Sequence, residues 1–245
     1  MTIMDAITIQ NISKKYKDVV AVDGLSLTVA QGELMSLLGV NGAGKTTVIK
    51  MLSCLTQPTD GDAFLLGKSI CRETAAVKEL IGVSPQETAI APGLSVRENL
   101  SLLCGVHGLG KAQSDEKISQ LTALFDLEQV LSKKAGKLSG GWQRRLSIAM
   151  ALVSDPKILF LDEPTLGLDV LARSDLWDII RNLKGKVTII LTTHYMEEAE
   201  ALSDRVAIMA KGKLLLCDTT AKIKELTDAS NLEQAFIQIV KEVRK

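Results

Sequence analysis

The chain has 245 residues, of which 46% are hydrophobic and only 3% aromatic, and its 29 basic residues balance its 29 acidic residues. This length is enough to bury a core as one large or two small domains, and zero net charge gives no electrostatic footprint for nucleic acid or anionic lipid. No apolar run approaches the ~20 residues that span a bilayer, and the segment after Met1–Asp5 alternates instead of forming the apolar stretch of a secretory signal. We therefore expect a protein that does not cross a membrane by itself.

The cysteines and histidines do not indicate a metal centre. Cys54, Cys71, Cys104 and Cys217 form no pair with metal-binding spacing, and two histidines cannot complete a convincing zinc site. We expect free, mostly buried thiols in a reducing cytosol.

The first part of the chain is typical of short strands around one helix. Alternation of period two predicts strands over Ala6–Ile12 and Leu25–Val29. A further strand, Glu33–Leu38, leads into a glycine-rich turn, and an apolar stripe that includes Leu55 predicts a helix over Thr46–Leu55. The elements expected next are a strand at Ala63–Leu66, a helix at Ala75–Leu80 and a strand at Ile81–Ser84.

The middle of the chain is expected to be helical throughout. Ser95 and Glu98 form a capping box, which predicts a helix start at that point. A second helix is expected from Ser114 through Leu124, and a third begins at Gly140.

Strands and helices alternate again after Pro156. Lys157–Leu161 and Val187–Leu191 are short apolar runs of the kind found in buried parallel strands, and Val206–Met209 and Leu214–Leu216 are expected to be two closing strands. This order predicts an α/β core with a helical insertion between roughly residues 87 and 155.

The strongest functional signal is the sequence Gly39-Val40-Asn41-Gly42-Ala43-Gly44-Lys45-Thr46, which matches G-x-x-x-x-G-K-[ST] between a predicted strand and a predicted helix. Its glycines let the backbone wrap closely around a phosphate, with N–H groups pointing inward. Lys45 supplies positive charge for the β- and γ-phosphates, and Thr46 offers a hydroxyl to Mg²⁺. The alternative is a glycine-rich turn that contains a lysine by chance, which the strand–loop–helix context makes rare.

A second signal follows the predicted strand Lys157–Leu161. Asp162 fits the carboxylate that a P-loop enzyme presents to Mg²⁺. Glu163, one residue further, could orient and deprotonate a water for attack on the γ-phosphate. Alone, such a pair is more often a solvated strand end, but a phosphate loop on the same chain favours function.

A third signal is Leu138-Ser139-Gly140-Gly141 at the start of a predicted helix. Ser139 is a natural N-cap, and the two glycines leave the first N–H groups of the helix open to a ligand. By itself, an ordinary capped helix is the simpler interpretation. Two phosphate-type sites require either a fold that brings both onto one nucleotide or two chains that meet head to tail.

The phosphate loop, the LSGG segment, the sequence Leu161-Asp162-Glu163-Pro164 and a downstream His194 together resemble the ATPase subunit of ATP-binding cassette (ABC) transporters. The resemblance covers essentially the whole chain in the same order. It implies an α/β fold with a P-loop NTPase core and parallel sheet, an N-terminal antiparallel β subdomain and a helical insertion subdomain. The expected organisation is a single ABC ATPase domain over residues 1–245, with a core at about 1–86 and 156–220, the insertion at about 87–155, and a short C-terminal helical tail at 221–245.

The same resemblance implies ATP and Mg²⁺ as cofactors. The residues that it assigns to nucleotide binding are Tyr16, which stacks on adenine, the phosphate loop Gly39, Val40, Asn41, Gly42, Ala43, Gly44, Lys45 and Thr46 with the adjoining Thr47, the signature residues Ser139, Gly140 and Gly141, and Asp169 of the loop that crosses a dimer interface. The residues that it assigns to Mg²⁺ are Thr46, Gln86 and Asp162. The catalytic residues are expected to be Glu163 as general base, His194 at the γ-phosphate, Gln86 and Lys45.

Several of these positions have a plainer interpretation. Tyr16 could be a half-buried aromatic at a strand end. His107, at a predicted helix C-terminus, is expected to be a dipole partner only. The acidic residues Glu197, Glu198 and Glu200 are expected to form the solvated face of a short helix.

One position departs from the family pattern. The signature commonly continues with Gln after its second Gly, whereas Trp142 stands there in this chain. The serine and glycine donors are intact. Together with Leu94–Leu100, Thr193–Glu200 and the segment Leu232–Phe236, this variation resembles the exporter-associated branch, which serves drug, lipid-linked polysaccharide, antibiotic and sodium efflux systems.

The resemblance implies an ATPase that works as a head-to-tail homodimer or heterodimer, peripheral to the cytoplasmic face of the cell membrane. Its expected partners are transmembrane permease subunits on a separate chain, contacted through the hydrophobic loop Glu87–Leu94, and no nucleic acid.

Two alternatives stay open. One is a soluble ABC-superfamily ATPase that acts on ribosomes or DNA, which neutral charge, a single phosphate loop and the absence of heptads disfavour. The other is a small-molecule kinase, which Glu163 and the second anion site disfavour.

Overall fold

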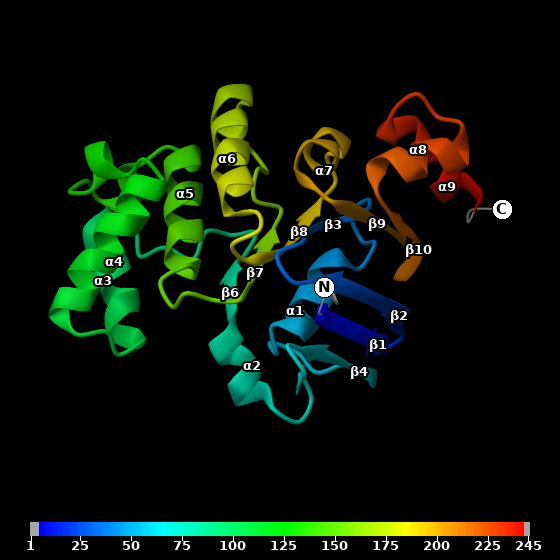
Figure 1. Cartoon of the computed structure of the whole chain (residues 1–245), viewed down its shortest axis with the longest axis horizontal. Coiled ribbons are helices and arrows are strands. Elements are labelled where there is room, and N and C mark those ends of the chain that lie inside the picture. Colours follow the sequence, from blue (N-terminus) through cyan, green and yellow to red (C-terminus); the bar gives the residue numbers. More distant parts are fainter. Residues whose placement is uncertain (1–4, 243–245) are drawn as a thin grey trace.

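The computed structural model describes residues 5–242. Residues 1–4 and 243–245 lie outside the described residues. The first range belongs to the segment in which we expect no secretory signal, and the second is the end of the expected helical tail. Figure 1 shows two sheets beside each other, with the helices of the middle of the chain on one side and the C-terminal helices on the other.

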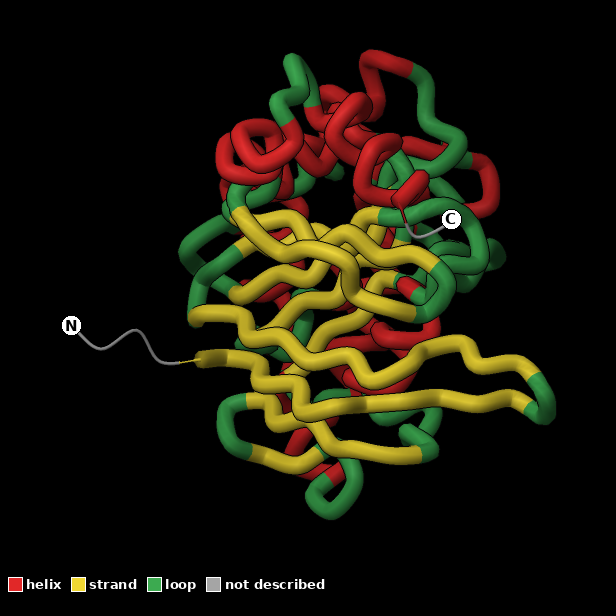
Figure 2. Tube along the Cα trace, turned by 90° about the vertical axis from the view of Figure 1, so that its right-hand side faces the viewer, coloured by secondary structure: helices red, strands yellow, loops and turns green. Residues whose placement is uncertain are grey.

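The smaller sheet is antiparallel and has the strand order β2-β1-β4-β5. Its strands are β1 (Asp5–Tyr16), β2 (Val19–Ala30), β4 (Asp60–Leu65) and β5 (Lys68–Ser69). The expected strands are confirmed, but β1 and β2 are longer than the alternation predicts because they pair as one hairpin that ends at Tyr16 opposite Val19. Figure 2 shows this hairpin extending well beyond the rest of the sheet.

The larger sheet has the order β10-β9-β3-β8-β7-β6. Its strands are β3 (Leu34–Leu38), β6 (Ile81–Ser84), β7 (Ile158–Asp162), β8 (Thr188–Thr193), β9 (Arg205–Ala210) and β10 (Lys213–Asp218). The neighbouring strands from β9 to β6 are parallel, and β10 pairs antiparallel with β9. Every residue of β3, β7 and β8 is buried, as continuous apolar runs predict for a parallel sheet covered on both faces.

The helices divide into groups by what they cover. The bounds are α1 (Lys45–Leu52), α2 (Thr74–Leu80), α3 (Val96–Val106), α4 (Lys111–Leu124), α5 (Gly140–Ala151), α6 (Val170–Leu183), α7 (Met196–Leu202), α8 (Thr220–Thr227) and α9 (Leu232–Glu242). Helix α1 packs between the two sheets, where its Val48 and Met51 join one apolar cluster with β1 and β7. The other face of the larger sheet carries α5 and α6, whose core continues into α3 and α4.

Some local predictions are confirmed and others are wrong. Ser95 and Glu98 form the expected capping box before α3. Helix α1, however, ends at Leu52, so Leu55 lies beyond it and is 68% exposed. Helix α4 begins at Lys111 rather than Ser114, because the side chain of Gln113 accepts a hydrogen bond from the Gly110 N–H and starts the helix earlier.

The cysteines and the hydropathy of the helices bear on two expectations for the whole chain. All four cysteines are free, but only Cys104 is fully buried, so the expectation of mostly buried thiols holds for one of them. Among the described residues, no helix combines the length and apolar character needed to span a bilayer.

Candidate functional site

The sheet order brings three loops of distant sequence to one edge. β3, β8 and β7 are neighbours and parallel, so their carboxyl ends lie together, and they are followed by Gly39, His194 and Glu163 respectively. A cavity of about 560 Å³ opens there. Its lining residues are Val19, Val20, Ala21, Asn41, Gly42, Ala43, Gly44, Lys45, Thr46, Thr47, Gln86, Glu163, Leu166 and His194.

The glycines of the loop between β3 and α1 are required by its shape. Gly42 and Gly44 adopt positive φ angles of 81° and 102°. A Cβ atom at Gly39 would lie 2.5 Å from the carbonyl oxygen of Met209, and one at Gly44 would collide with the carbonyl of Ala21. The loop therefore leads into an open N-terminus of α1, whose backbone N–H groups and dipole favour an anion.

Lys45 and His194 hold the carboxylate of Glu163 between them. Lys45 Nζ donates to the carbonyl of Gly39 at 2.7 Å and lies 3.2 Å from Glu163 Oε1. His194 Nδ1 lies 2.7 Å from the other carboxylate oxygen, Oε2. Since Lys45 and Glu163 are only 6% exposed, this ion pair is shielded from solvent.

The backbone of Glu163 is itself unusual. Its φ angle is 49°, a left-handed conformation that glutamate rarely adopts. The Glu163 N–H donates to both the carbonyl oxygen of Thr192, at 3.1 Å, and its hydroxyl, at 3.0 Å. β8 thus holds the turn after β7 in a strained form, which aims the carboxylate into the cavity.

A second set of oxygen atoms lies beside this carboxylate. The hydroxyls of Thr46 and Thr192 donate to Asp162 Oδ1 at 3.1 Å and 2.5 Å. A carboxylate beside a threonine hydroxyl is the hard-oxygen set that Mg²⁺ prefers, since that ion completes its shell with waters and substrate phosphates. In residues 5–242 there is no cluster of three or more His, Cys, Asp or Glu that would indicate another metal centre.

The LSGG segment does not line this cavity. Ser139 occupies the N-cap position of α5, but its side chain makes no capping hydrogen bond and is exposed. A Cβ at Gly140 would contact Leu168, and one at Gly141 would contact Ala172, so the segment lies against the start of α6 and the loop before it. Figure 1 shows α5 well apart from α1.

Four other expected nucleotide contacts also lie outside the lining: Tyr16, Gly39, Val40 and Asp169. Tyr16 is 44% exposed at the end of β1, with Lys14 Nζ 5.1 Å from its ring centre. Asp169 caps α6 by accepting a hydrogen bond from the Ala172 N–H at 2.9 Å. Sequence reasoning missed Val19, Val20, Ala21 and Leu166, since strand alternation and loop composition do not mark which residues face a cavity.

The expectation for Glu198 is wrong. Glu197 and Glu200 are exposed, but Glu198 is fully buried. Trp177 Nε1 donates to its Oε1 at 3.0 Å, and its Oε2 has no hydrogen-bond partner among residues 5–242. Burial raises the pKa of this carboxyl. The signal was the apolar spacing of Ala199 and Leu202, which places Glu198 on the inner face of α7.

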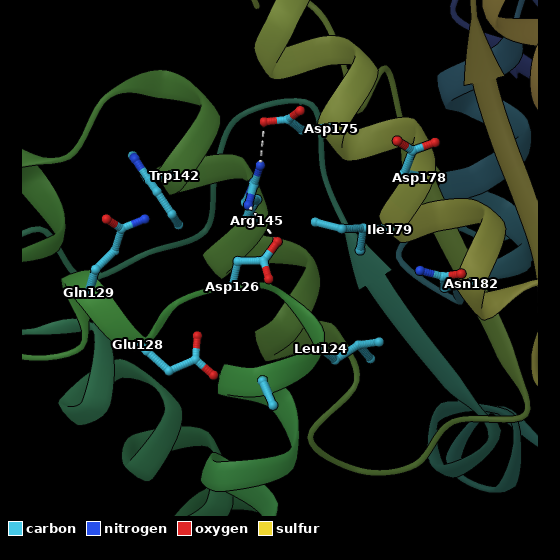
Figure 3. Close-up of a pocket in the computed structure, with 11 residues that line it drawn as sticks. Leu124, Asp126, Glu128, Gln129, Trp142, Arg145, Asp175, Asp178, Ile179 and Asn182 are labelled. Atoms are coloured by element: carbon cyan, nitrogen blue, oxygen red, sulfur yellow. Dashed lines mark hydrogen bonds and ion pairs between the residues drawn. The ribbon is translucent and has the colours of Figure 1, made fainter.

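A larger groove, of about 840 Å³, lies elsewhere between α5, α6 and the segment after α4. Figure 3 shows Arg145 between Asp126 and Asp175 in this groove, with Trp142 beside it. None of the expected site residues lines it, so the smaller cavity is the candidate site.

Known proteins resemble this chain over most of its length. The family described as ABC transporter matches residues 22–166, and a family described as "AAA domain, putative AbiEii toxin, Type IV TA system" matches residues 133–200. The daunorubicin resistance ATP-binding protein DrrA3 of Streptomyces coeruleorubidus is 39% identical over 229 residues, which cover 93% of this chain and 72% of that protein.

A second relative is the Nod factor export ATP-binding protein I of Burkholderia lata. It is 43% identical over 209 residues, covering 84% of this chain and 68% of that protein. Three further curated relatives are far longer, and this chain spans only 13% to 22% of their length. A solved structure described as the ATP-binding subunit of an ABC transporter superposes with a TM-score of 0.85 at 26% identity, covering 96% of this chain and 99% of that chain.

Proposed function

The chain belongs to the ABC transporter family of ATP-binding, ATP-hydrolysing subunits, and on that premise we propose that it drives export through a separate permease as part of a head-to-tail dimer. The observation that carries the proposed chemistry is the Glu163 carboxylate held between Lys45 and His194 inside the cavity of the phosphate loop.

Glu163 is the proposed general base. A phosphate in the loop would compete for Lys45 Nζ, which lies 3.2 Å from Glu163 Oε1. Transfer of Lys45 to the phosphate would leave Glu163 free to accept a proton from an attacking water, while His194 keeps the carboxylate oriented. Positioning and charge carry such a reaction, since phosphoryl transfer leaves little covalent chemistry to the protein.

The Asp162 and Thr46 oxygens, joined by a hydrogen bond of 3.1 Å, are the proposed Mg²⁺ ligands, with Gln86 at the same cavity. When bound, Mg²⁺ would neutralise charge on the β- and γ-phosphates.

The geometry of α5 supports the composite site. Ser139 and Gly140 are exposed at the start of a helix whose N-terminus favours an anion, and they do not face the cavity of their own chain. A second ATPase subunit, identical or different, could place this helix end over the nucleotide.

The loop Glu87–Leu94 is the proposed permease surface. Ile90 packs against the helical core, and the exposed residues of the loop are Glu87, Ala89, Pro92 and Gly93. The exposed surface is therefore less apolar than the sequence predicts. The location that follows is peripheral, at the cytoplasmic face of the membrane, as part of a transporter complex.

Export as the direction of transport is supported by the relatives. One is named for Nod factor export and the other for daunorubicin resistance. Neither these relatives nor the matching ABC transporter family favours action on ribosomes or DNA, and the match is to a transporter family rather than to small-molecule kinases.

Replacement of the proposed base tests the mechanism. Glu163→Gln is expected to lower phosphate release by roughly 10²–10⁴-fold, because it removes the proton acceptor but keeps the shape of the side chain. ATP affinity, measured by equilibrium binding, should be retained. Glu197→Gln, which changes an exposed glutamate of α7, is the matched control. Near-normal phosphate release by Glu163→Gln would overturn the assignment.

The partner is tested separately by recovering the tagged chain from native cells. Recovery in the membrane fraction with a permease subunit is expected. Pelleting with ribosomes or DNA instead would contradict the transport proposal.

A further inference from the structure

Helix α5 carries two adjacent buried arginines, Arg144 and Arg145, which contact different neighbours. Arg145 lies 3.2 Å from an oxygen of Asp126 and 2.9 Å from one of Asp175, in the groove of Figure 3. Arg144 instead contacts the segment that follows β6. Its Nη1 donates to the carbonyl of Pro85 and its Nη2 to the carbonyl of Gln86, both at 2.6 Å.

The environment of Arg144 makes these two bonds important. Arg144 is only 4% exposed, and its guanidinium forms no ion pair with another described residue. Burial lowers the pKa of the guanidinium, and the charges of Asp162 and Glu198 oppose that effect. A buried cation needs hydrogen-bond acceptors, and a charge-assisted bond is about twice as strong as a neutral one. The carbonyls of Pro85 and Gln86 therefore stabilise the buried guanidinium, and the guanidinium in turn fixes the position of these two carbonyls.

The rest of α5 lies directly against the strand that leads to Gln86. The hydroxyls of Ser147 and Ser84 share a hydrogen bond of 3.0 Å. A Cβ at Gly82 would collide with the carbonyl of Ala151, so helix and strand are in backbone contact there. Arg144 adds to this packing two hydrogen bonds to the first two residues after β6, Pro85 and Gln86.

We infer that Arg144 is a positioning residue, which fixes the backbone of Gln86 against α5 so that the Gln86 side chain stays at the nucleotide cavity. The two carbonyls belong to consecutive residues and are reached by separate nitrogens of one planar fork, which a single ammonium group cannot reproduce. Because α5 begins at the LSGG segment, the same contact links the backbone of Gln86 to the helix that carries the signature residues. The inference rests on the catalytic role proposed for Gln86.

A double-mutant cycle between Arg144 and Gln86 tests this positioning role. Arg144→Met should lower kcat by roughly 10- to 100-fold, the usual effect of a small misplacement in a catalytic site, with ATP affinity unchanged. Arg144→Lys, which keeps the charge but has a single donating nitrogen in place of the fork, should recover part of that loss. In a Gln86→Ala background, Arg144→Met should cause less than about a twofold further loss, because no Gln86 side chain is left for Arg144 to position.

Ser147→Ala is the matched control. It removes the hydrogen bond between Ser147 of α5 and Ser84 of β6 but leaves the contacts of the Gln86 backbone intact. We expect kcat to stay near that of the unmodified protein. Thermal unfolding of every variant shows which of them fold, and Arg144→Lys and Arg144→Gln replace Arg144→Met in the cycle if the latter does not.

The outcomes separate the two proposals. Additive losses in the double variant, or a loss in Ser147→Ala as large as that in Arg144→Met, would overturn the positioning role while leaving the proposed function intact. Unimpaired turnover in Gln86→Ala would instead overturn the role proposed for Gln86, and the positioning inference with it.

Discussion

Glu163 shows how a residue can be prepared for chemistry by its neighbours. Its left-handed backbone is held by two contacts to Thr192, and its carboxylate is shared between Lys45 and His194. Strain of this kind persists only where surrounding structure enforces it, and it gathers at functional sites. The sequence indicates the residue type at this place, whereas the strain depends on the register between β7 and β8.

The raised pKa of the buried Glu198 can be tested through the pH dependence of stability. Burial raises its pKa in the folded protein, so the protonated form is favoured by folding. The stability associated with that proton is fully present below the unfolded pKa of about 4.3 and is lost as pH rises toward the folded value. Glu198→Gln, which mimics the protonated carboxyl, should therefore raise the melting temperature at pH 8 and give no gain at pH 4.

Thermal unfolding followed by circular dichroism measures this difference. Glu197→Gln, next along the chain and exposed, should leave the melting temperature nearly unchanged at both pH values. An equal shift for Glu198→Gln at pH 4 and pH 8 would show that the carboxyl does not change protonation on folding.

At the scale of elements, hydrophobic patterns predict where strands lie better than they predict where helices end. β6 is found at the expected Ile81–Ser84, because a short apolar strand is read directly from its residues. Leu55 was misplaced because an apolar stripe does not show where a helix stops, and here Cys54 turns the chain at a φ of 57°. α6, which sits beside the LSGG segment, was not predicted by its own pattern.

Asn99 gives an element-scale prediction about the proposed permease loop. It is fully buried in α3, its Oδ1 accepts from the Ala91 N–H at 2.8 Å, and its Nδ2 donates to the carbonyl of Ser95 at 2.9 Å. Asn99→Ala leaves the N–H of Ala91 without its partner, at a cost of about 1–3 kcal/mol, while the carbonyl of Ser95 keeps its bond from the Asn99 N–H. We expect lower stability in urea and faster proteolysis within residues 87–95.

The control for Asn99→Ala is Asn182→Ala, on an exposed position of α6. It should change neither the urea midpoint nor the proteolysis of the loop. Proteolysis of the loop that stays at the unmodified rate in Asn99→Ala would mean that other contacts hold the loop.

The whole molecule decides a question that the sequence left open. The motifs predicted two anion sites but not whether one chain would bring both to one nucleotide. The fold assembles the phosphate loop, Asp162, Glu163 and His194 at adjacent strand ends, because those strands are neighbours. It leaves Ser139 on another helix end, outside that cavity. Linear motifs carry no information about such separation.

Ser139→Arg therefore separates binding from assembly. The new side chain at an exposed helix end should leave ATP affinity of the isolated chain unchanged, since Ser139 does not line the cavity. It should abolish ATP-dependent dimerisation, because a bulky group would occupy the place where the second subunit's nucleotide meets the helix N–H groups. Sedimentation analysis in a Glu163→Gln background, where slow hydrolysis keeps ATP bound, measures the dimer.

Ser132→Arg, at an exposed loop position, should dimerise normally. Undiminished dimerisation of Ser139→Arg would mean that the signature helix end does not meet the partner's nucleotide, and each chain would then complete its site alone.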